Sequence, residues 1–277
     1  MKKTKTVLIT GCSSGFGLDA AKRFSRAGWN VIATMRSPER DAELRALPEM
    51  LVLRLDVQDR ASIAAAISAG LARFGAIDVL VNNAGFGLFG IFESTPREKI
   101  QEQFDVNVFG VMDVTRAVLP HLRARKSGVI LNVSSGAGVF TLPLLTGYCA
   151  SKFALEGFSE ALSYELLSQG IVVKILEPGG VVTTGFGPRS AKEAGQAAPI
   201  PDYDAFLAHA LAKFAGLRSS RLATSEQVAE AIFTAATDGT DRLRYVATAD
   251  IEPLVKARRE TSEAGYLQLM RDTFLSR

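Results

Sequence analysis

Short apolar runs recur along the chain, and most of them do not alternate with polar residues. A run of this kind, rich in Val, Ile and Leu, is typical of a strand that is buried on both faces of a parallel sheet. The sequence therefore predicts a largely buried parallel sheet. The predicted strands are Thr6–Thr10, Asn30–Met35, Met50–Leu55, Val79–Val81, Val129–Val133 and Ile171–Leu176, with Arg244–Ala247 as a final strand.

Segments with helical periodicity separate these runs. Strand and helix alternate over the first two thirds of the chain, which is the pattern of right-handed crossovers in a doubly wound sheet. We therefore expect a single α/β domain with three α/β/α layers, in which helices cover both faces of a doubly wound parallel sheet. The predicted helices follow the first strand as far as Ala27 and then span 59–74, 96–119, 148–169, 203–217 and 226–236.

Two local signals refine this plan. Thr95 is a good N-cap, Pro96 suits the first helical position and Glu98 suits the third, so we expect a helix to begin at Pro96. Gly, Pro, Ala and Thr dominate residues 179–201. Because helical patterns resume behind this stretch, it predicts a long mobile connection inside one domain rather than a boundary between two domains.

Composition narrows the class of protein. The chain has 277 residues, of which 47% are hydrophobic and 22% are charged, a balance that fits a folded globular protein and excludes a disordered one. The 32 Lys and Arg residues against 29 Asp and Glu residues leave a net charge of +3. That excess is too small to favour nucleic acid or an anionic membrane as a partner.

Cysteine and histidine usage and the N-terminus bear on location. Cys12 and Cys149 cannot form a disulfide framework, which favours a reducing compartment. Two histidines are too few for a metal site built from histidine, and we expect no metal. The apolar run Val7–Ile9 is shorter than the ~7–15 residues of a signal peptide, and no run reaches the ~18 residues of a membrane span. These features predict a cytoplasmic protein.

Glycines cluster where the first strand meets the first helix. Thr10 is followed by Gly-Cys-Ser-Ser-Gly-Phe-Gly, which places Gly11, Gly15 and Gly17 in the turn. A diphosphate binds where backbone N–H groups at a helix N-terminus approach it closely, and a Cβ would prevent that approach. A glycine-rich turn without a ligand is the alternative, but the position between a strand and a helix favours a dinucleotide site.

The end of the second predicted strand bears on which dinucleotide binds. An acid at this position bonds the 2′-hydroxyl of the adenosine ribose, whereas an Arg accommodates a 2′-phosphate. The strand ends in Thr34-Met-Arg-Ser37 without a carboxylate, so Arg36 favours NADP(H), with NAD(H) as the alternative. If Arg36 is only a solvated charge at the strand end, the sequence gives no preference.

Tyr148 and Lys152 are the main candidates for proton transfer. They are four residues apart at the start of a predicted helix and therefore share one face. A tyrosine with a pKa near 10 transfers protons poorly at neutral pH, and a nearby ammonium group lowers that pKa. This spacing alone is common on helix surfaces. Ser134 and Ser135 strengthen the interpretation of Tyr148 and Lys152 as a catalytic pair, because the two serines end an apolar strand at the edge where open α/β sheets bind ligands.

Together these residues resemble the short-chain dehydrogenase/reductase family in its single-domain form. The resemblance implies a Rossmann-like fold, and residues 148–157 are also similar to the hydroxysteroid and retinol dehydrogenase branch. The landmarks stand in the family's order and near its spacing over residues 5–185: Thr10-Gly-x-x-x-Gly-x-Gly17, Asp56-Val57, Asn82-Asn-Ala-Gly85, Asn107, Ser135, Tyr148-x-x-x-Lys152 and Pro178-Gly179.

The resemblance also implies a role for each matching residue. Ser135 would bond the substrate oxygen, Tyr148 would be the general acid and base, and Lys152 would tune Tyr148 and bond the nicotinamide ribose. Asn107 would hold a water of the proton relay and completes the four implied catalytic residues. The implied cofactor-binding residues are Gly11, Ser13, Ser14, Gly15, Phe16, Gly17, Arg36, Asp56, Val57, Asn83, Ala84, Gly85, Tyr148, Lys152, Pro178, Gly179, Val181 and Thr183.

The substrate side is expected from the segments that flank these landmarks. Residues 138–145 and the stretch after Pro178 carry few charges, which predicts an apolar pocket for a hydrophobic ketone or secondary alcohol such as a steroid, a retinoid or a xenobiotic carbonyl. At least half of these apolar side chains are equally consistent with the core. The expected substrate contacts are Ser135, Val139, Leu142, Tyr148 and Phe186, and the expected substrate loop and lid span about 179–222.

Three functions remain open. An NADP(H)-dependent oxidoreductase is favoured, because every chemical residue of the family is present. A non-catalytic NADP-sensing regulatory protein is the alternative of another class and would usually lack the tyrosine or the lysine. A dehydratase or epimerase is disfavoured, because little chain is left for an extra substrate domain.

The assembly and the C-terminal segment are less determined by the sequence. Family members usually associate through helix faces, so the resemblance implies a homodimer or a homotetramer. The segment from Ile251 onward mixes charged with apolar residues. It either caps the active site or docks on a neighbouring subunit.

Overall fold

A single parallel sheet organises the molecule. The computed structural model describes residues 4–181, 190, 200–219 and 222–275, and within them seven strands run in the order β3-β2-β1-β4-β5-β6-β7. The order reverses between β1 and β4, and ligands of doubly wound sheets bind at the carboxyl ends of the strands beside such a point. The strands are β1 (Thr6–Thr10), β2 (Asn30–Met35), β3 (Met50–Arg54), β4 (Val79–Asn82), β5 (Gly128–Val133), β6 (Ile171–Glu177) and β7 (Arg244–Val246).

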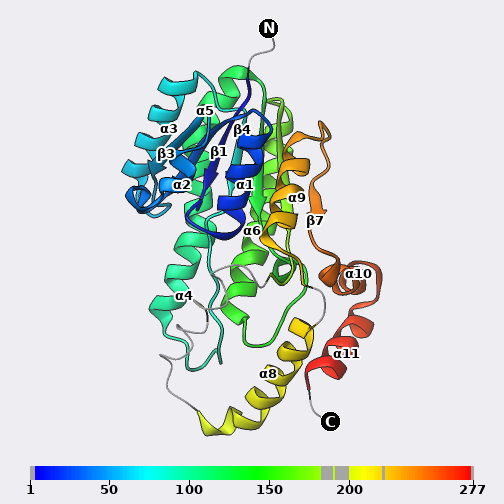
Figure 1. Ribbon diagram of the computed structural model, residues 1–277. Coiled ribbons are helices and arrows are strands. Elements are labelled where there is room, and N and C mark those ends of the chain that lie inside the picture. The colour runs from blue at the N-terminus through cyan, green and yellow to red at the C-terminus, as the bar shows by residue number, and fades with distance from the viewer. Residues whose placement is uncertain (1–3, 182–189, 191–199, 220–221, 276–277) are drawn as a thin grey trace.

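Helices cover both faces of the sheet, which confirms the doubly wound α/β/α fold (Figure 1). None of the helices in the described part of the chain is long and apolar enough to cross a membrane. One face packs against α1 (Gly15–Arg26), α2 (Ala42–Arg45) and α9 (Ser225–Thr237), and the other against α3 (Arg60–Phe74), α5 (Gly110–Arg125) and α6 (Thr146–Leu167).

Each central strand supplies side chains to two separate cores. Along β1, Val7 and Ile9 enter the core beneath α1 and α9, whereas Leu8 enters the core beneath α3, α5 and α6. In the same way, β2 sends Ala33 to the first core and Ile32 to the second. Full burial of one such side chain contributes about 1.5–3 kcal/mol. This double burial is why the strands read as continuous apolar runs in the sequence.

The predicted helix 96–119 is divided into three parts. It consists of α4 (Arg97–Phe104), a π-helical turn (Asp105–Phe109) and α5, which continues to Arg125. Short π-helical turns are rare and recur at functional sites. The sequence did not indicate the turn, because residues 105–109 contain no Gly or Pro that would mark a change of helix type.

The start of this helix differs from the prediction by one residue. Pro96 has extended backbone angles (φ −57°, ψ 140°) and is itself the N-cap, so the expectation that Thr95 would cap the helix is wrong. The hydroxyl of Thr95 instead donates a hydrogen bond to the carbonyl of Ile91 at 2.8 Å, within the preceding loop. A local bond of this kind competes with capping for the same side chain.

A chain of buried polar side chains ties the sheet to α5 and α6. Asn82 Nδ2 donates to Thr115 Oγ1 on α5 at 3.0 Å and to Asn132 Oδ1 on β5 at 2.9 Å. Asn132 Nδ2 then donates to Ser159 Oγ on α6 at 2.8 Å. All four side chains are buried, where an unpaired polar group would cost about 1–3 kcal/mol. These hydrogen bonds hold α6 against β5, the strand that leads into Ser135.

The C-terminal segment docks on its own chain at one end of the sheet. After α8 (Asp204–Ser219) and β7, the chain forms α10 (Glu252–Glu260) and α11 (Glu263–Phe274). The yellow α8 and the red α11 lie together at the lower end of Figure 1, away from the N-terminus. The residues Ile251, Val255 and Tyr266 form a small core with Val139 and Phe140, which follow β5.

Candidate active site

The turn between β1 and α1 requires its glycines for steric reasons. Gly11 and Gly15 have φ values of +74° and +56°, in the left-handed region that favours glycine. A Cβ on Gly17 would lie 2.4 Å from the carbonyl oxygen of Gly11 and 2.5 Å from Nδ2 of Asn83. A Cβ on Gly11 would lie 2.9 Å from Cα of Ala84. The turn is therefore pressed against the end of β4.

The N-terminus of α1 fits an anionic group. Ser14 is the N-cap, but its side chain makes no capping hydrogen bond, and the first turn of this helix contains no acid. Ser13 and Ser14 are exposed, while Gly15 and Phe16 are half-buried. Backbone N–H groups that have no capping side chain, together with the helix dipole, form a site for phosphate. The turn and this helix end are where the diphosphate of a dinucleotide would be held.

Thr10 links the glycine turn to the segment after β4. Its Oγ1 accepts hydrogen bonds from the backbone N–H groups of Asn83 and Ala84, each at 3.0 Å. Asn83 Nδ2 donates in return to the carbonyl of Thr10 at 2.8 Å and to that of Gly11 at 3.2 Å. This role of Thr10 was not predicted from the sequence. Its position directly before the first glycine is the signal that could have identified it.

The other implied adenosine contacts lie along the same edge. Arg36 is exposed directly after β2, and Asp56 is half-buried after β3 with Oδ1 accepting the Gln58 N–H at 3.1 Å. Val57 is buried in the core beneath α3 and α5, where a Cβ on Gly110 would lie 2.7 Å from its Cγ2. Arg36 and Asp56 therefore have side chains in reach of solvent, whereas Val57 packs mainly inside the protein.

Ser135, Tyr148 and Lys152 come together at the carboxyl end of β5. The hydroxyl of Ser135 is hydrogen-bonded to the phenol of Tyr148, and Ser135 Oγ also accepts the Ala137 N–H at 3.1 Å. Lys152 Nζ donates to the carbonyl of Val133 at 2.9 Å and lies 5.8 Å from the centre of the Tyr148 ring. The spacing of four residues places both side chains on one face of α6, as expected.

Burial sets the protonation of this pair. It raises the pKa of Tyr148 to about 12, although the hydrogen bond with Ser135 opposes the rise. It lowers the pKa of Lys152 from its usual 10.5 to about 8, although the negative charge of Glu156 opposes the fall. At neutral pH the phenol therefore holds its proton and the lysine remains mostly charged. The expected lowering of the Tyr148 pKa by Lys152 is not observed: desolvation dominates, and the hydrogen bond with Ser135 is what opposes it.

Asn107 occupies the π-helical turn and faces the active site. Its Nδ2 donates to the carbonyl of Phe86 at 2.8 Å and to Ser151 Oγ at 3.1 Å, and its Oδ1 accepts the Phe86 N–H at 3.0 Å. A Cβ on Gly85 would lie 3.1 Å from this Oδ1 and 3.8 Å from Lys152 Nζ. The side chain thus fixes the segment after β4 beside the lysine, and its role toward a water stays a prediction.

The segment after β6 is held by two residues of the C-terminal region, Thr248 and Asp250, which were not predicted as site residues. The N–H of Gly179 donates to Thr248 Oγ1 at 2.8 Å, and the N–H of Gly180 donates to Asp250 Oδ2 at 2.9 Å. A Cβ on Gly179 would lie 2.3 Å from that same carboxylate oxygen. The carbonyl of Pro178 accepts the Gly136 N–H at 2.8 Å, and Val181 forms a bridge with Ala223. Thr183 and Phe186 lie outside the described residues.

Apolar side chains surround the tyrosine on the substrate side. Tyr148 packs with Ala137, Leu145 and Cys149, and Phe89 and Leu142 pack against this group. The ring of Phe89 in turn meets that of Phe214 on α8, with centroids 5.5 Å apart. Val139 packs into the small core with α10 and α11, and its contact with substrate stays a prediction.

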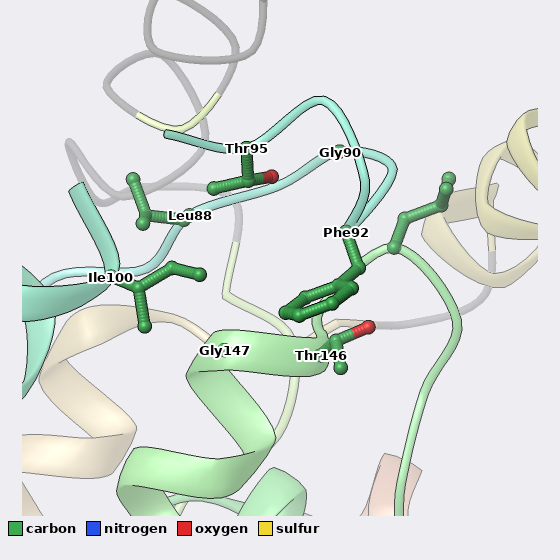
Figure 2. A pocket seen from close by; sticks show the side chains of 8 residues that line it. Leu88, Gly90, Phe92, Thr95, Ile100, Thr146 and Gly147 are labelled. Atoms are coloured by element: carbon green, nitrogen blue, oxygen red, sulfur yellow. The ribbon is translucent and has the colours of Figure 1, made fainter. Parts of the chain in front are cut away.

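Two hollows lie near the start of α6. Figure 2 shows the smaller one, where the ring of Phe92 lies over Thr146 and Thr95 faces Leu88 and Ile100. Its volume of about 10 Å³ is close to that of a single water, so it is too small for a substrate. A more open hollow of about 500 Å³ is bordered by Leu142, Pro143, Cys149 and Phe153.

The sequence matches a family model and many curated proteins. Residues 5–194 match the model described as short chain dehydrogenase. The uncharacterized oxidoreductase YusZ of Bacillus subtilis is 43% identical over 187 residues, which are 65% of this chain and 66% of that protein. Estradiol 17-beta-dehydrogenase 1 of Rattus norvegicus is 36% identical over 279 residues, which cover 95% of this chain and 80% of that protein. The chain thus spans just under two thirds of the former.

Solved structures share the same architecture. A short-chain dehydrogenase from Streptomyces avermitilis has a TM-score of 0.79 and 33% identity, covering 97% of this chain and 94% of that one. A short chain dehydrogenase/reductase from Burkholderia phymatum in complex with NAD has a TM-score of 0.80 and 26% identity over 99% and 98% of the two chains. A serine dehydrogenase complexed with NADP+ has a TM-score of 0.74 and 31% identity over 87% and 94%.

Proposed function

The chain belongs to the short-chain dehydrogenase family, and we propose that it is an NADP(H)-dependent oxidoreductase that interconverts a carbonyl and a secondary alcohol on a hydrophobic substrate. The observation that carries this proposal is the group formed by Ser135, Tyr148 and Lys152 at the carboxyl end of β5. It stands beside the glycine turn of β1 at the switch point of the sheet, where a nicotinamide dinucleotide would lie across the crevice.

The reaction follows from what each side chain can do. Bound NADP(H) supplies the hydride in reduction and accepts it in oxidation. In reduction, the phenol of Tyr148 donates its proton to the substrate oxygen, and Ser135 donates a hydrogen bond to the same oxygen as negative charge develops there. Lys152 stabilises the phenolate that remains on Tyr148 until the phenolate regains a proton from solvent. Oxidation reverses these steps.

Arg36 is the basis for preferring NADP(H) over NAD(H). Arg36 is exposed directly after β2. The carboxylate of Asp41 accepts the Leu44 N–H at 2.9 Å as the cap of α2, so it is already engaged in the protein. A guanidinium group binds a 2′-phosphate strongly, whereas an acid would repel it. Because relatives of this fold are solved with NAD and with NADP+, the fold itself accommodates both cofactors.

The substrate is proposed to be a hydrophobic ketone or secondary alcohol. The support is the apolar wall around Tyr148, formed by Phe89, Leu142 and Leu145, with Phe214 of α8 behind it. The rat relative is named for estradiol, a compound of this class. Residues 179–222 are proposed to supply the substrate loop and lid, and α8 is the described part of that segment that reaches the wall.

A homodimer or homotetramer in a reducing compartment, the cytoplasm, is also proposed. Support for an oligomer comes from large apolar side chains that lie exposed on α6 and the neighbouring π-helical turn, namely Phe109, Phe153, Tyr164 and Leu167. Support for the compartment comes from the cysteines: Cys12 and Cys149 are free and buried, and burial raises the pKa of Cys12 to about 12.

Turnover assays test the proposal directly. NADPH and NADH oxidation would be followed by absorbance with a panel of hydrophobic ketones. We expect turnover with NADPH, and a loss of about 10²–10⁴-fold in kcat for Tyr148→Phe with NADPH affinity within a few-fold of wild type. Tyr164→Phe is the matched control, because this tyrosine lies on the same helix and is 70% exposed.

The outcomes separate the alternatives. A fully active Tyr148→Phe enzyme would refute the catalytic role. Tight NADPH binding without turnover of any ketone would favour the regulatory protein that senses NADP(H). Turnover only with NADH would support the proposed oxidoreductase reaction and would contradict the proposed preference for NADP(H). Where NADPH is used, Arg36→Ala should lower kcat/KM for NADPH by about 10–100-fold and leave that for NADH within about threefold.

A further inference from the structure

The catalytic face of α6 continues into the protein as a row of charges. Tyr148, Lys152, Glu156 and Glu160 follow one another at intervals of four residues, so they form one stripe along the helix. Lys152 and Glu156 are buried, while Glu160 is half-buried. A buried carboxylate therefore lies one helical turn behind the catalytic lysine.

Glu156 is packed between the lysine and the turn that carries Ser135. A Cβ on Gly138 would lie 2.9 Å from Cγ of Glu156, 2.8 Å from Oγ of Ser134 and 3.1 Å from the carbonyl oxygen of Lys152. The side chain of Glu156 is buried and is therefore largely out of reach of solvent. An ionised carboxylate in such a place is costly unless it is paired.

Arginines from two distant elements supply the pairing. Arg244 of β7 donates from Nε to Glu156 Oε2 at 3.0 Å and also bonds Glu160. Glu177, fully buried at the end of β6, lies 3.6 Å from the same Nε and accepts from Arg259 of α10 at 2.5 Å. The cluster thus contains three acids, which are Glu156, Glu160 and Glu177. Its three bases are Lys152, Arg244 and Arg259.

The pKa of Glu156 is raised above its usual value, chiefly by burial. Burial raises the pKa of Glu156, the Ser134 hydroxyl lowers it, the charge of Glu177 raises it, and Arg244 lowers it. The charge of Glu156 in turn raises the pKa of Lys152 against the effect of burial. The charge of the lysine is thus coupled to a carboxylate that is hydrogen-bonded to Arg244 of β7.

We propose that Glu156 is a positioning residue that keeps Lys152 charged, and that Arg244 keeps Glu156 ionised. This inference rests on the proposed function, in which the charged lysine stabilises the phenolate of Tyr148. The polar groups that face Lys152 are Tyr148 and Glu156 on its own helix, Asn107 on the π-helical turn and the carbonyl of Val133 on β5. Those that face Glu156 are Lys152, Ser134, Glu177 and Arg244.

The sign of the effect on pH dependence follows. Ketone reduction needs Tyr148 protonated and Lys152 charged, and the lysine loses its charge first as the pH rises because its pKa is about 8 and that of Tyr148 is about 12. Removing the negative charge of Glu156 destabilises the ammonium group and lowers the pKa of Lys152 further. The alkaline limb of the kcat profile should therefore move to lower pH.

Glu156→Gln tests this, because it removes the charge and keeps the shape. The profile of kcat for ketone reduction would be measured from pH 6 to 10 at saturating NADPH. We expect the alkaline limb of the kcat profile to lie about one pH unit lower in Glu156→Gln than in wild type. Glu160→Gln is the matched control: it removes an acid that bonds the same arginine one turn further from the lysine, and it should move the limb by less than about 0.3 unit.

A second readout does not depend on turnover. The Cε resonance of Lys152, in protein with 13C-labelled lysine, would be titrated without cofactor and assigned by its loss in Lys152→Met. Its pKa should fall in Glu156→Gln and in Arg244→Met, and the double variant should show no further fall. Glu156→Asp keeps the charge and should restore a limb near that of wild type, even where thermal unfolding shows that it is less stable.

Two results would overturn the proposal. One is a folded Glu156→Gln whose alkaline limb and Lys152 titration match those of wild type. The other is a Glu160→Gln shift as large as that of Glu156→Gln, which would mean a general effect of charge. If wild type turns over no ketone, the proposed function fails, while the Lys152 titration still decides whether Glu156 sets the charge of the lysine.

Discussion

The glycine turn after β1 and the C-terminal helices border the same end of the sheet, but they are held there in different ways. The turn is held by the main chain: Gly17 leaves no room for a Cβ, and Thr10 and Asn83 bond backbone groups on both sides. The C-terminal segment is held by side chains that reach across the sequence. Tyr266 accepts the N–H of Thr141, which is 125 residues away.

This difference predicts how each region responds to substitution. At the glycine turn, one added methyl group meets backbone atoms that cannot yield, so a single substitution acts on the whole site. In the C-terminal segment, the binding is divided among many contacts, each of which contributes about 1 kcal/mol. The first region should therefore fail at once and affect cofactor, whereas the second should weaken in steps and affect substrate.

Gly17→Ala should produce the largest effect. The new Cβ would lie 2.4 Å from the carbonyl oxygen of Gly11, and the backbone of the turn would have to shift. We expect the free energy of unfolding to fall by about 3 kcal/mol, measured by urea denaturation, and NADPH binding to be lost in fluorescence titration. Gly157→Ala is the control, because that helical glycine is exposed with no atom within 4 Å and should gain about 0.5–1 kcal/mol. Unchanged NADPH binding in Gly17→Ala would remove the contrast between the two regions.

Phe214→Ala should produce an intermediate effect that is confined to substrate. The half-buried ring of Phe214 lies between Phe89, at 5.5 Å, and Phe274 of α11, at 5.7 Å. Its loss removes two ring contacts of about 0.5–1.5 kcal/mol each, so unfolding should need about 1–3 kcal/mol less. KM for hydrophobic ketones should rise several-fold, while the Kd for NADPH stays within twofold. Leu211→Ala, an exposed site on the same helix, should change neither, and a weaker NADPH affinity in Phe214→Ala would contradict the separation of the regions.

The regions also differ in how far the sequence predicts them. β1 and β2 begin and end at the expected residues, because each apolar side chain on them is buried in one of two cores and the apolar run has sharp limits. The pairing of Tyr148 with Lys152 was equally predictable, since helical spacing alone brings them together. Local geometry decides these features, and local geometry is visible in a short stretch of sequence.

The features that were not predicted depend on residues far apart in the chain. The bonds of Asp250 to Gly180 and of Arg259 to Glu177 join the C-terminal segment to the end of β6, and no local pattern marks either partner. The π-helical turn at Asn107 was not predicted, because residues 105–109 contain no Gly or Pro that would mark a change of helix type. The protonation of Tyr148 also differed from the expectation, because burial depends on the whole fold.

Tyr266→Phe is the smallest change and the sharpest test of the stepwise behaviour. It removes one hydroxyl, which accepts the Thr141 N–H at 3.1 Å, and leaves the buried ring in the core with Val139 and Val255. We expect a loss of about 1 kcal/mol in urea unfolding, because the Thr141 N–H loses its partner. Thr141 adjoins Leu142 of the substrate wall, so KM for a hydrophobic ketone should rise by less than about threefold while kcat and NADPH affinity stay at wild-type values. Tyr164→Phe, on the exposed face of α6, should alter none of these quantities. A large loss of kcat in Tyr266→Phe would show that the C-terminal segment also positions the catalytic tyrosine. The loss of the Tyr266–Thr141 hydrogen bond would then act on Tyr148 through Leu142, which packs against the group that contains Tyr148.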